Sequence, residues 1–256
     1  MNGNIILVVA HPGEETLGCA RLLLREPEKL LILHVADGAS RDEKALRRAG
    51  AKSVADLIRI RREELLAAMG EFGIGEHQLL SGGFAEREVV HSLPRAVDTV
   101  LKLLRAERPA EVHTHPFEGG HPDADAVCYA VHRAVEILEE TGEVRPAIFE
   151  FTGYHAREGL FHSIDFLSPY PMTQITVLDE DERERKEKAL RCFRSQYDLY
   201  VRFAIREERW RRADRYDFGT RPHEGALYYE LSRSGFTWDD FEKLVAKLQR
   251  QPPDSV

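Results

Sequence analysis

The sequence predicts an α/β fold in the form of a Rossmann-like, doubly wound and mostly parallel sheet with helices on both faces. Three observations predict it. Short apolar runs rich in β-branched residues alternate along the chain with longer segments of helical periodicity. Two of these runs end in a His-Pro loop that contains glycines and carboxylates and then opens a helix. Hydrophobic residues make up 43% of the 256 residues, which is enough for a substantial core.

The first half of the chain alternates between predicted strands and helices. Its first apolar run is continuous, as expected for a central strand of a parallel sheet. A polar stretch up to Arg48 and the pair Leu79-Leu80 before Gly82-Gly83 are weaker signals. The expected strands are Asn4–Ala10, Leu30–Val35 and Glu111–His115, and the expected helices are Thr16–Leu24, Val54–Phe72 and Leu93–Leu104.

The second half is predicted to hold a long charged helix between short strands. Asp179 and Glu182 have the spacing of a capping box, and this helix is expected to run to Arg212. One face of it would carry the apolar residues Leu190, Phe193, Tyr197, Val201 and Ala204. The other expected elements are helices over Ala126–Glu140 and Trp238–Leu248 and strands over Ala147–Tyr154, Thr173–Val177 and Ala226–Leu231.

No repeat, low-complexity linker or clear boundary divides the chain. We therefore expect a single domain over residues 1–256, with a Rossmann-like core over 1–160 and a C-terminal portion over 161–256 that closes the pocket.

Composition excludes several classes of function. A net charge of −8 disfavours binding to nucleic acid, because phosphate backbones would be repelled. The longest clean apolar stretch, Ile5–Ala10, is far shorter than the roughly 20 residues that cross a bilayer. The N-terminus carries no basic segment typical of a secretion signal, so a cytoplasmic protein without membrane contact is expected. Cys19, Cys128 and Cys192 form no CxxC pair and are expected to be reduced core residues.

The loop after the first strand is the first candidate site. Ligands of open α/β sheets bind at the carboxyl ends of the strands, and His11, Glu14 and Glu15 stand there. A hydrolytic metal site needs two or three nitrogen or oxygen ligands, an open position for water and a group that moves protons. His11 and Glu14, three residues apart on one turn, could supply two of the ligands.

A second loop, Thr114–Asp125, follows the strand that ends near His115 and would converge with the first loop in a doubly wound sheet. His121 and Asp123 could form a pair in which the carboxylate orients the imidazole. A charged ring held in this way would stabilise a developing oxyanion.

These two motifs resemble those of the LmbE-like or PIG-L-like metal-dependent N-deacetylases. VVAHPGEETLG, ending at Gly18, is similar to the family's Ala-His-Pro-Asp-Asp-Glu-Thr-x-Gly, and THPFEGGHPDAD, over Thr114–Asp125, is similar to its second motif. Arg61–Leu65 resembles its Arg-x-x-Glu-Leu segment, and segments near the C-terminus, among them Pro222–Gly225, resemble one bacterial subgroup. The resemblance implies zinc-dependent removal of acetyl groups from N-acetylglucosaminyl compounds and related amides.

Four positions match the family's functional residues. The resemblance implies that His11 is the first metal ligand and that Glu14, in place of an aspartate, is another. It assigns His121 to the oxyanion-stabilising histidine and Asp123 to its carboxylate partner. Arg61 and His223 are implied to be substrate-binding residues.

Two positions depart from the family. Gly13 replaces the aspartate that serves as general base, and Ala124 replaces the second ligand histidine. Loss of a general base alone costs about 10²–10⁴-fold in rate, and loss of one of three ligands weakens zinc binding. If the protein is an inactive relative, restoring both, as Gly13→Asp with Ala124→His, is expected to create metal affinity that the parent lacks. Four nearby residues could instead replace the missing ligand or base: Asp125, His115, His223 and Glu15.

Two functions from different classes follow. The first is an amidohydrolase for an N-acetylated sugar or small amide that binds zinc or another divalent metal. The second is an inactive relative without metal, which binds a sugar-like ligand or serves as a partner subunit. The substrate and the oligomeric state stay open.

Each candidate also has a purely structural alternative. His11 could simply end its strand, and Glu14 could interact favourably with the helix dipole from the first turn. His121 with Asp123 could form a helix cap, Arg61 could lie on an exposed helix face, and His223 could be a loop residue.

Overall fold

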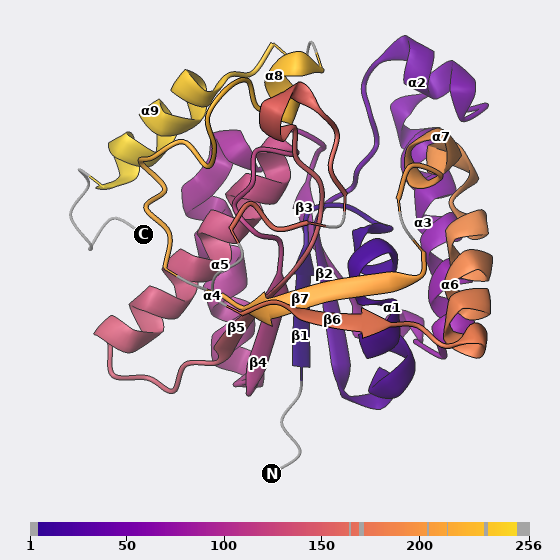
Figure 1. Ribbon diagram of the computed structural model, residues 1–256, viewed down its shortest axis with the longest axis horizontal. Helices are drawn as coiled ribbons and strands as arrows, with labels where there is room; N and C mark the ends of the chain where they lie inside the picture. Colours follow the sequence, from indigo (N-terminus) through magenta and orange to yellow (C-terminus); the bar gives the residue numbers. More distant parts are fainter. Residues whose placement is uncertain are drawn as a thin grey trace.

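The computed structural model describes residues 5–163, 165–168, 172–203, 205–213, 215–232 and 235–249. Its centre is a seven-stranded sheet in the order β3-β2-β1-β4-β5-β7-β6 (Figure 1). The first five strands pair in parallel, and β7 joins β5 and β6 in antiparallel fashion. The mostly parallel fold class is thereby confirmed. The strands are β1 (Ile5–Val9), β2 (Leu30–Ala36), β3 (Leu79–Phe84), β4 (Glu111–Thr114), β5 (Ala147–Phe151), β6 (Gln174–Val177) and β7 (Glu207–Arg212).

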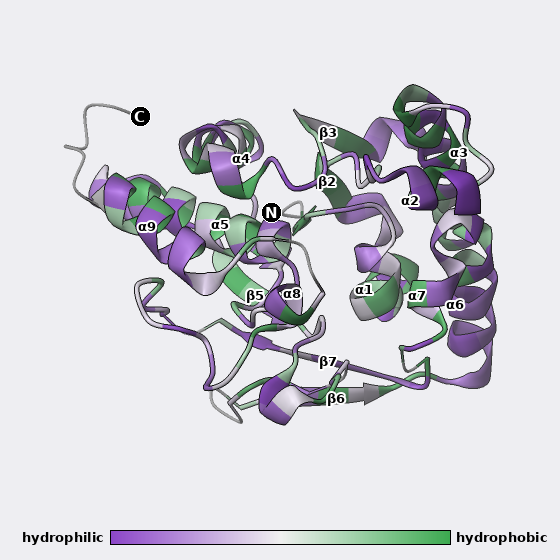
Figure 2. Cartoon of the chain, turned by 90° about the horizontal axis from the view of Figure 1, so that it is seen from above, coloured by the Kyte–Doolittle hydropathy of each residue, from purple (hydrophilic) through white to green (hydrophobic). Residues whose placement is uncertain are grey.

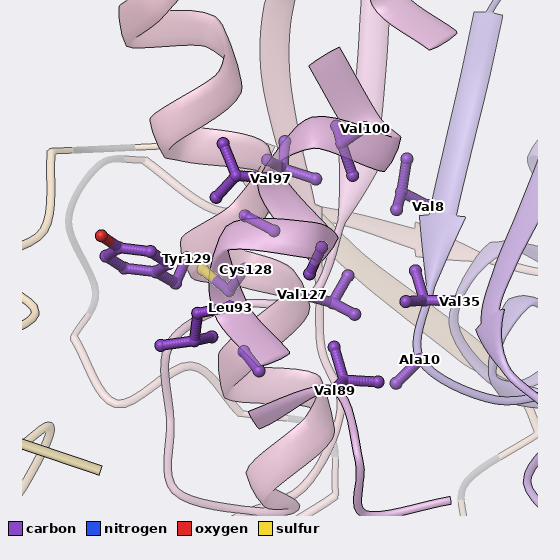
Figure 3. Close-up of a cluster of buried hydrophobic side chains, with 14 of the residues drawn as sticks. Val8, Ala10, Val35, Val89, Leu93, Val97, Val100, Val127, Cys128 and Tyr129 are labelled. Carbon is purple, nitrogen blue, oxygen red and sulfur yellow. The ribbon is translucent and has the colours of Figure 1, made fainter. Parts of the chain in front are cut away.

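Helices cover both faces of the sheet, because the central strands are apolar on both sides. Leu7 and Val9 of β1 pack with α1, α3 and α6, whereas Ile6 and Val8 pack with α4, α5 and α9. Figure 3 shows Val8 facing the valines of α4 and α5. The helices of four or more residues are α1 (Glu14–Arg25), α2 (Glu43–Arg48), α3 (Val54–Phe72), α4 (Leu93–Glu107), α5 (Pro122–Glu140), α6 (Glu180–Cys192), α7 (Tyr197–Tyr200), α8 (Tyr228–Leu231) and α9 (Trp238–Gln249).

The connectivity reverses between β1 and β4. From β1 the chain moves outward to β2 and β3, and it then returns to place β4 on the other side of β1. The loops that follow β1 and β4 therefore leave the same edge of the sheet side by side, which is where doubly wound proteins bind ligands. The predicted convergence of the two His-Pro loops is confirmed.

The capping box at Asp179 is confirmed, but the long helix predicted from it is wrong. Asp179 Oδ1 accepts the backbone N–H of Glu182 at 2.9 Å, yet α6 ends at Cys192 and residues 207–212 form strand β7. Tyr197 and Val201 are 54% and 58% exposed, so the apolar face stops at Phe193. Ala204 lies outside the described residues.

The strand predicted over Ala226–Leu231 is also wrong. This segment turns into the short helix α8, in which the Glu230 carboxylate accepts the backbone N–H of Leu227 at 2.7 Å. A carboxylate that reaches back to the first turn in this way starts a helix rather than a strand. Within the described residues no helix is long and apolar enough to cross a membrane.

The cysteine prediction is confirmed for two of the three residues. Cys19 and Cys128 are buried free thiols, whereas Cys192 is only half-buried. Cys128 lies among the apolar side chains between α4 and α5 (Figure 3).

Candidate functional site

A cavity of about 510 Å³ opens where the loops after β1, β3 and β4 meet α2, α3 and α7. Its volume falls within the range of small-molecule sites. Charged, imidazole and aromatic side chains share its lining, including His11, Glu14, Arg61, Glu86, His121 and Tyr200. Three of the residues predicted from the two loops, and the predicted Arg61, therefore lie at one cavity.

His11 is held between two carboxylates. Its Nδ1 lies 3.1 Å from Glu14 Oε1 and its Nε2 lies 3.2 Å from Asp123 Oδ2. Burial alone would lower the pKa of His11, but Glu14 and Asp123 outweigh it and raise the pKa to about 10. Both ring nitrogens of His11 therefore act as hydrogen-bond donors to these carboxylates.

Glu14 links the two loops. Its Oε2 accepts the backbone N–H of His11 at 2.7 Å and lies 3.1 Å from His115 Nε2. Burial opposes ionisation, but His115 and His11 hold the pKa of Glu14 well below its usual range. The carboxylate is thus fixed between two imidazoles.

Asp123 and His121 are arranged differently from the expected pair. The Asp123 carboxylate contacts His11 and accepts backbone N–H groups of Arg87 and Val90, at 2.5 and 3.3 Å. His121 instead caps α5, since its Nδ1 accepts the backbone N–H of Asp123 at 3.2 Å. Burial, together with the nearby His11, lowers the pKa of His121 to about 4. The ring is therefore neutral, and its Nε2 carries the proton.

Gly13 lies against Tyr200. The backbone of Gly13 has a φ of +104°, and a Cβ added there would lie 1.9 Å from the Tyr200 hydroxyl oxygen and 2.6 Å from the ring carbon that bears it. The same hydroxyl donates to the backbone oxygen of Pro12 at 2.9 Å. On this backbone, any side chain at position 13 would collide with the Tyr200 phenol.

The residues present do not fit the family's three-ligand metal site. Ala124 offers no donor atom, and both nitrogens of His11 face carboxylate oxygens. A different group is close enough to hold an ion: one ligand atom from each of His11, His121 and Asp123 lies within 4.8 Å of the others. Within this group His11 Nε2 now lies 3.2 Å from Asp123 Oδ2, whereas the helix cap uses only the Nδ1 of His121 and leaves its Nε2 free.

Two of the four proposed replacement residues are engaged elsewhere. Glu15 is buried and accepts the backbone N–H of Gly13 at 2.8 Å, and it lies 3.2 Å from His34 Nε2. Asp125 Oδ1 accepts the backbone N–H groups of two loop residues, Glu118 and Gly119, at 3.2 and 3.1 Å. Both carboxylates shape the loops rather than face the cavity.

The other two replacement residues lie in different places. His115 is in contact with Glu14 and lies at the smaller neighbouring cavity. His223 has its Nδ1 2.7 Å from the backbone oxygen of Glu224 and its ring 6.2 Å from that of His155. His223 is absent from the described residues that line the 510 Å³ cavity, whereas Arg61 is among them.

Sequence reasoning missed several residues at this cavity. Glu86 follows β3, so the strand-end rule would have found it if β3 had been extended beyond Leu80 to Phe84. Tyr200 comes from a distant short helix and carries no local signal. The cavity is also lined by Arg48, Tyr154, Arg194 and Phe203.

Comparison with protein families matches residues 6–135, just over half of the chain, to PIG-L, the GlcNAc-PI de-N-acetylases. A comparison with curated protein sequences finds no match.

Solved structures share the fold at low sequence identity. A deacetylase in complex with teicoplanin is 16% identical with a TM-score of 0.62, covering 83% of this chain and 100% of that chain. A deacetylase for the pseudoaglycone of the antimicrobial A40926 is 19% identical with a TM-score of 0.60, covering 84% and 100%. The N,N'-diacetylchitobiose deacetylase from Pyrococcus horikoshii is 19% identical with a TM-score of 0.54, covering 78% and 73%.

Proposed function

The chain belongs to the PIG-L family of GlcNAc-PI de-N-acetylases, and from that premise we propose that it binds an N-acetylated sugar or a related small amide in the 510 Å³ cavity without metal-dependent hydrolysis. The observation that carries the proposal is the position of Tyr200. Its phenol lies where a Cβ at Gly13 would be, and glycine itself has no side chain to deprotonate water. A family member that lacks this base, and that has alanine in place of the metal-binding histidine at position 124, keeps the pocket but not the groups for metal-dependent hydrolysis.

What remains in the cavity suits binding. The neutral His121 has its protonated Nε2 free of the cap, so it can donate a hydrogen bond to an amide carbonyl oxygen. Tyr154 and Phe203 add aromatic surface next to it, and such surface stacks on the apolar face of a sugar ring. The structural neighbours, a deacetylase in complex with teicoplanin and an N,N'-diacetylchitobiose deacetylase, support a sugar-like ligand.

A second candidate is a hydrolase with an altered metal site. It is favoured by the spacing of His11, His121 and Asp123, whose ligand atoms lie within 4.8 Å of one another. It requires stoichiometric metal and release of acetate, whereas the binding function requires neither.

Isothermal titration calorimetry with N-acetylglucosamine and N,N'-diacetylchitobiose, in chelator and then in zinc, separates the two. We expect equal affinity in both buffers and no acetate in an end-point assay. His121→Asn keeps a good helix cap but shortens the donor, and it should weaken binding about tenfold. The exposed His77→Ala is the control and should change nothing. Binding or acetate release that appears only with zinc would establish the hydrolase instead.

A further inference from the structure

We propose that Glu64 is a positioning residue for ligand binding, which holds one wall of the 510 Å³ cavity in place through Ser195. The inference rests on the proposed function and adds to it a residue that sets the affinity of the site. It is carried by two hydrogen bonds that Ser195 donates to the two oxygens of the Glu64 carboxylate.

The wall is formed by Arg194–Tyr200, which we call the wall segment. Every residue of this segment lines the 510 Å³ cavity. The segment follows α6 and consists of the 3-10 turn Arg194–Gln196 and the four-residue helix α7. Figures 1 and 2 both place α7 beside α6, on the side of the molecule where α3 also lies. The shape of the cavity therefore depends on where this segment is held.

The wall segment has little structure of its own to keep it in place. One 3-10 turn and one turn of α-helix are too short to be stable by themselves in water. Within the described part of the chain, only Ser195 and Tyr200 of this segment form hydrogen bonds to elements distant in the sequence. Tyr200, at the C-terminal end, is buried and donates to the backbone oxygen of Pro12 at 2.9 Å. The N-terminal end depends on Ser195.

Glu64 holds that end with both of its carboxylate oxygens. Oε1 accepts the backbone N–H of Ser195 at 2.8 Å, and Oε2 accepts the Ser195 hydroxyl at 2.6 Å. Hydrogen bonds to an ionised carboxylate are shorter and stronger than those between neutral groups. Glu64 itself is not among the described residues that line the cavity. It therefore acts on a ligand through the wall segment rather than by direct contact.

The place of Glu64 on α3 relates it to Arg61. The two residues are three positions apart on this helix, so their side chains leave it on the same face. Arg61 lines the cavity, while Glu64 reaches Ser195 of the wall segment. The Arg-x-x-Glu spacing thus places a cavity residue and the support of the wall on one face of α3.

A wall that is already held in place favours binding. A ligand that contacts a loose segment must order it, and the entropy cost of that ordering lowers the affinity. When only a fraction of the molecules has the segment in the binding position, the apparent dissociation constant rises by the inverse of that fraction. Glu64 removes this cost before the ligand arrives.

The first part of the test compares Glu64→Ala with Glu63→Ala by hydrogen–deuterium exchange without ligand. Glu63 is the matched control, because it lies next to Glu64 on α3, is exposed and pairs with Arg59 at 2.6 Å. We expect amides of the wall segment to exchange about tenfold or more faster in Glu64→Ala, with those of β1 unchanged. An equal rise in β1 and the wall segment would assign Glu64 to general stability and overturn the inference.

The second part measures the affinity for N,N'-diacetylchitobiose by isothermal titration calorimetry in chelator. Glu64→Ala should weaken binding about tenfold, and Glu63→Ala should leave it unchanged. Glu64→Gln is the conservative variant, since its amide oxygen accepts the N–H of Ser195 and its NH₂ donates to the hydroxyl oxygen. It should restore the affinity to within about threefold of the parent.

Ser195→Ala tests whether Glu64 acts through Ser195. It should weaken binding less than Glu64→Ala does, because the backbone N–H is kept. It should have almost no further effect when Glu64→Ala is already present. Losses that add up in the double variant would show that the two residues act independently, and would overturn the inference.

Faster exchange of the wall segment with unchanged affinity would overturn the role of Glu64 in binding and leave the proposed function standing. Unchanged exchange in Glu64→Ala would show that Glu64 does not hold the wall, and would overturn the inference in the same way. No binding of the sugar by the parent protein would overturn the proposed function, and the role of Glu64 in binding with it.

Discussion

At Gly13 the backbone conformation and the phenol of Tyr200 together decide which side chain the first loop can carry. A φ of +104° is unfavourable for any residue with a Cβ, and the hydroxyl 1.9 Å from that Cβ adds a direct collision. The expectation that Gly13→Asp with Ala124→His creates metal affinity therefore needs a third change at Tyr200. The departure from the family pattern at Gly13 is therefore coupled to Tyr200.

We predict that Gly13→Ala destabilises the protein by about 2–5 kcal/mol, the sum of left-handed strain and overpacking. Gly142→Ala is the control, since Gly142 has a φ of +72° and open space around it, so it isolates the strain. Urea denaturation should show a larger loss at Gly13 than at Gly142. The extra loss should shrink when Tyr200→Ala is combined with Gly13→Ala. Equal losses at the two glycines would contradict the collision with Tyr200.

Residue identities in the two loops could be predicted from the sequence, but their pairing could not. His11, Glu14, His121 and Arg61 are all at the cavity, as expected from strand-end position and motif. The sequence does not reveal which imidazole contacts the Asp123 carboxylate. His121 is the nearest in sequence, but its Nδ1 accepts a backbone N–H, and His11 is the partner instead. Hydrogen-bond choice between two close rings is a three-dimensional property.

At the scale of elements, α1 is broken and is joined to β7 and α6 by a buried ion pair. Cys19 has a non-helical φ of −131°, which frees backbone groups of its neighbours. Glu208 of β7 accepts the N–H groups of Ala20 and Arg21 at 2.8 and 3.0 Å. Lys186 of α6 donates to the backbone oxygen of Leu17 at 2.6 Å and to Glu208 at 2.8 Å. The pair replaces the hydrogen bonds that a continuous helix would make.

Removing one partner of this ion pair should strongly destabilise the folded protein. Lys186→Met leaves a buried carboxylate without its cation, and we expect a loss of about 3–5 kcal/mol in the free energy of unfolding. The control on the same helix is Lys188→Met, which removes an exposed pair with Glu184 and should cost less than about 1 kcal/mol. Chemical denaturation of both variants measures the difference. Similar small losses would show that Glu208 does not depend on Lys186.

Asp125, in the first turn of α5, gives the fold a pH dependence. Burial raises the pKa of Asp125 to about 7, against the two backbone N–H groups it accepts. Because the folded pKa is above the unfolded one, the stabilisation is complete below about pH 4 and is lost as the pH rises through 7. Between pH 5 and 8 this amounts to about 3 kcal/mol.

Asp125→Asn keeps the acceptor oxygen and cannot ionise. Its unfolding free energy should therefore fall less between pH 5 and 8 than that of the parent, with the gap appearing at the higher pH. Denaturation curves of both proteins at the two pH values provide the measurement. Parallel losses would mean that Asp125 stays ionised in the folded protein.

Element prediction failed where charges face inward. Strand β7 reads Glu-Glu-Arg-Trp-Arg-Arg, and its buried side chains include Glu208 and Arg211. A search for alternating apolar residues cannot detect such a strand, so the charge pattern predicts that the preceding helix continues over it. The apolar strands β1 and β2 and the long helix α3, by contrast, match their predicted ranges closely.

At the scale of the whole molecule, the alternation of strands and helices was sufficient to predict the parallel sheet and the edge that carries the site. The walls of the cavity were not predictable in the same way, because Arg48, Arg194 and Tyr200 come from short helices and turns that leave little periodic signal. Family membership identifies the kind of site from which this one derives. Gly13, Ala124 and Tyr200 affect whether it can still bind metal and catalyse hydrolysis.

The most direct test of this account is the metal content of the purified protein, measured by mass spectrometry after dialysis against zinc and then against metal-free buffer. We predict close to zero zinc per chain, because the family's ligand set is incomplete at Ala124 and His11 is bound on both sides by carboxylates. Close to one zinc per chain would contradict this prediction, and His11, His121 and Asp123 would then be the first candidate ligands to test by substitution.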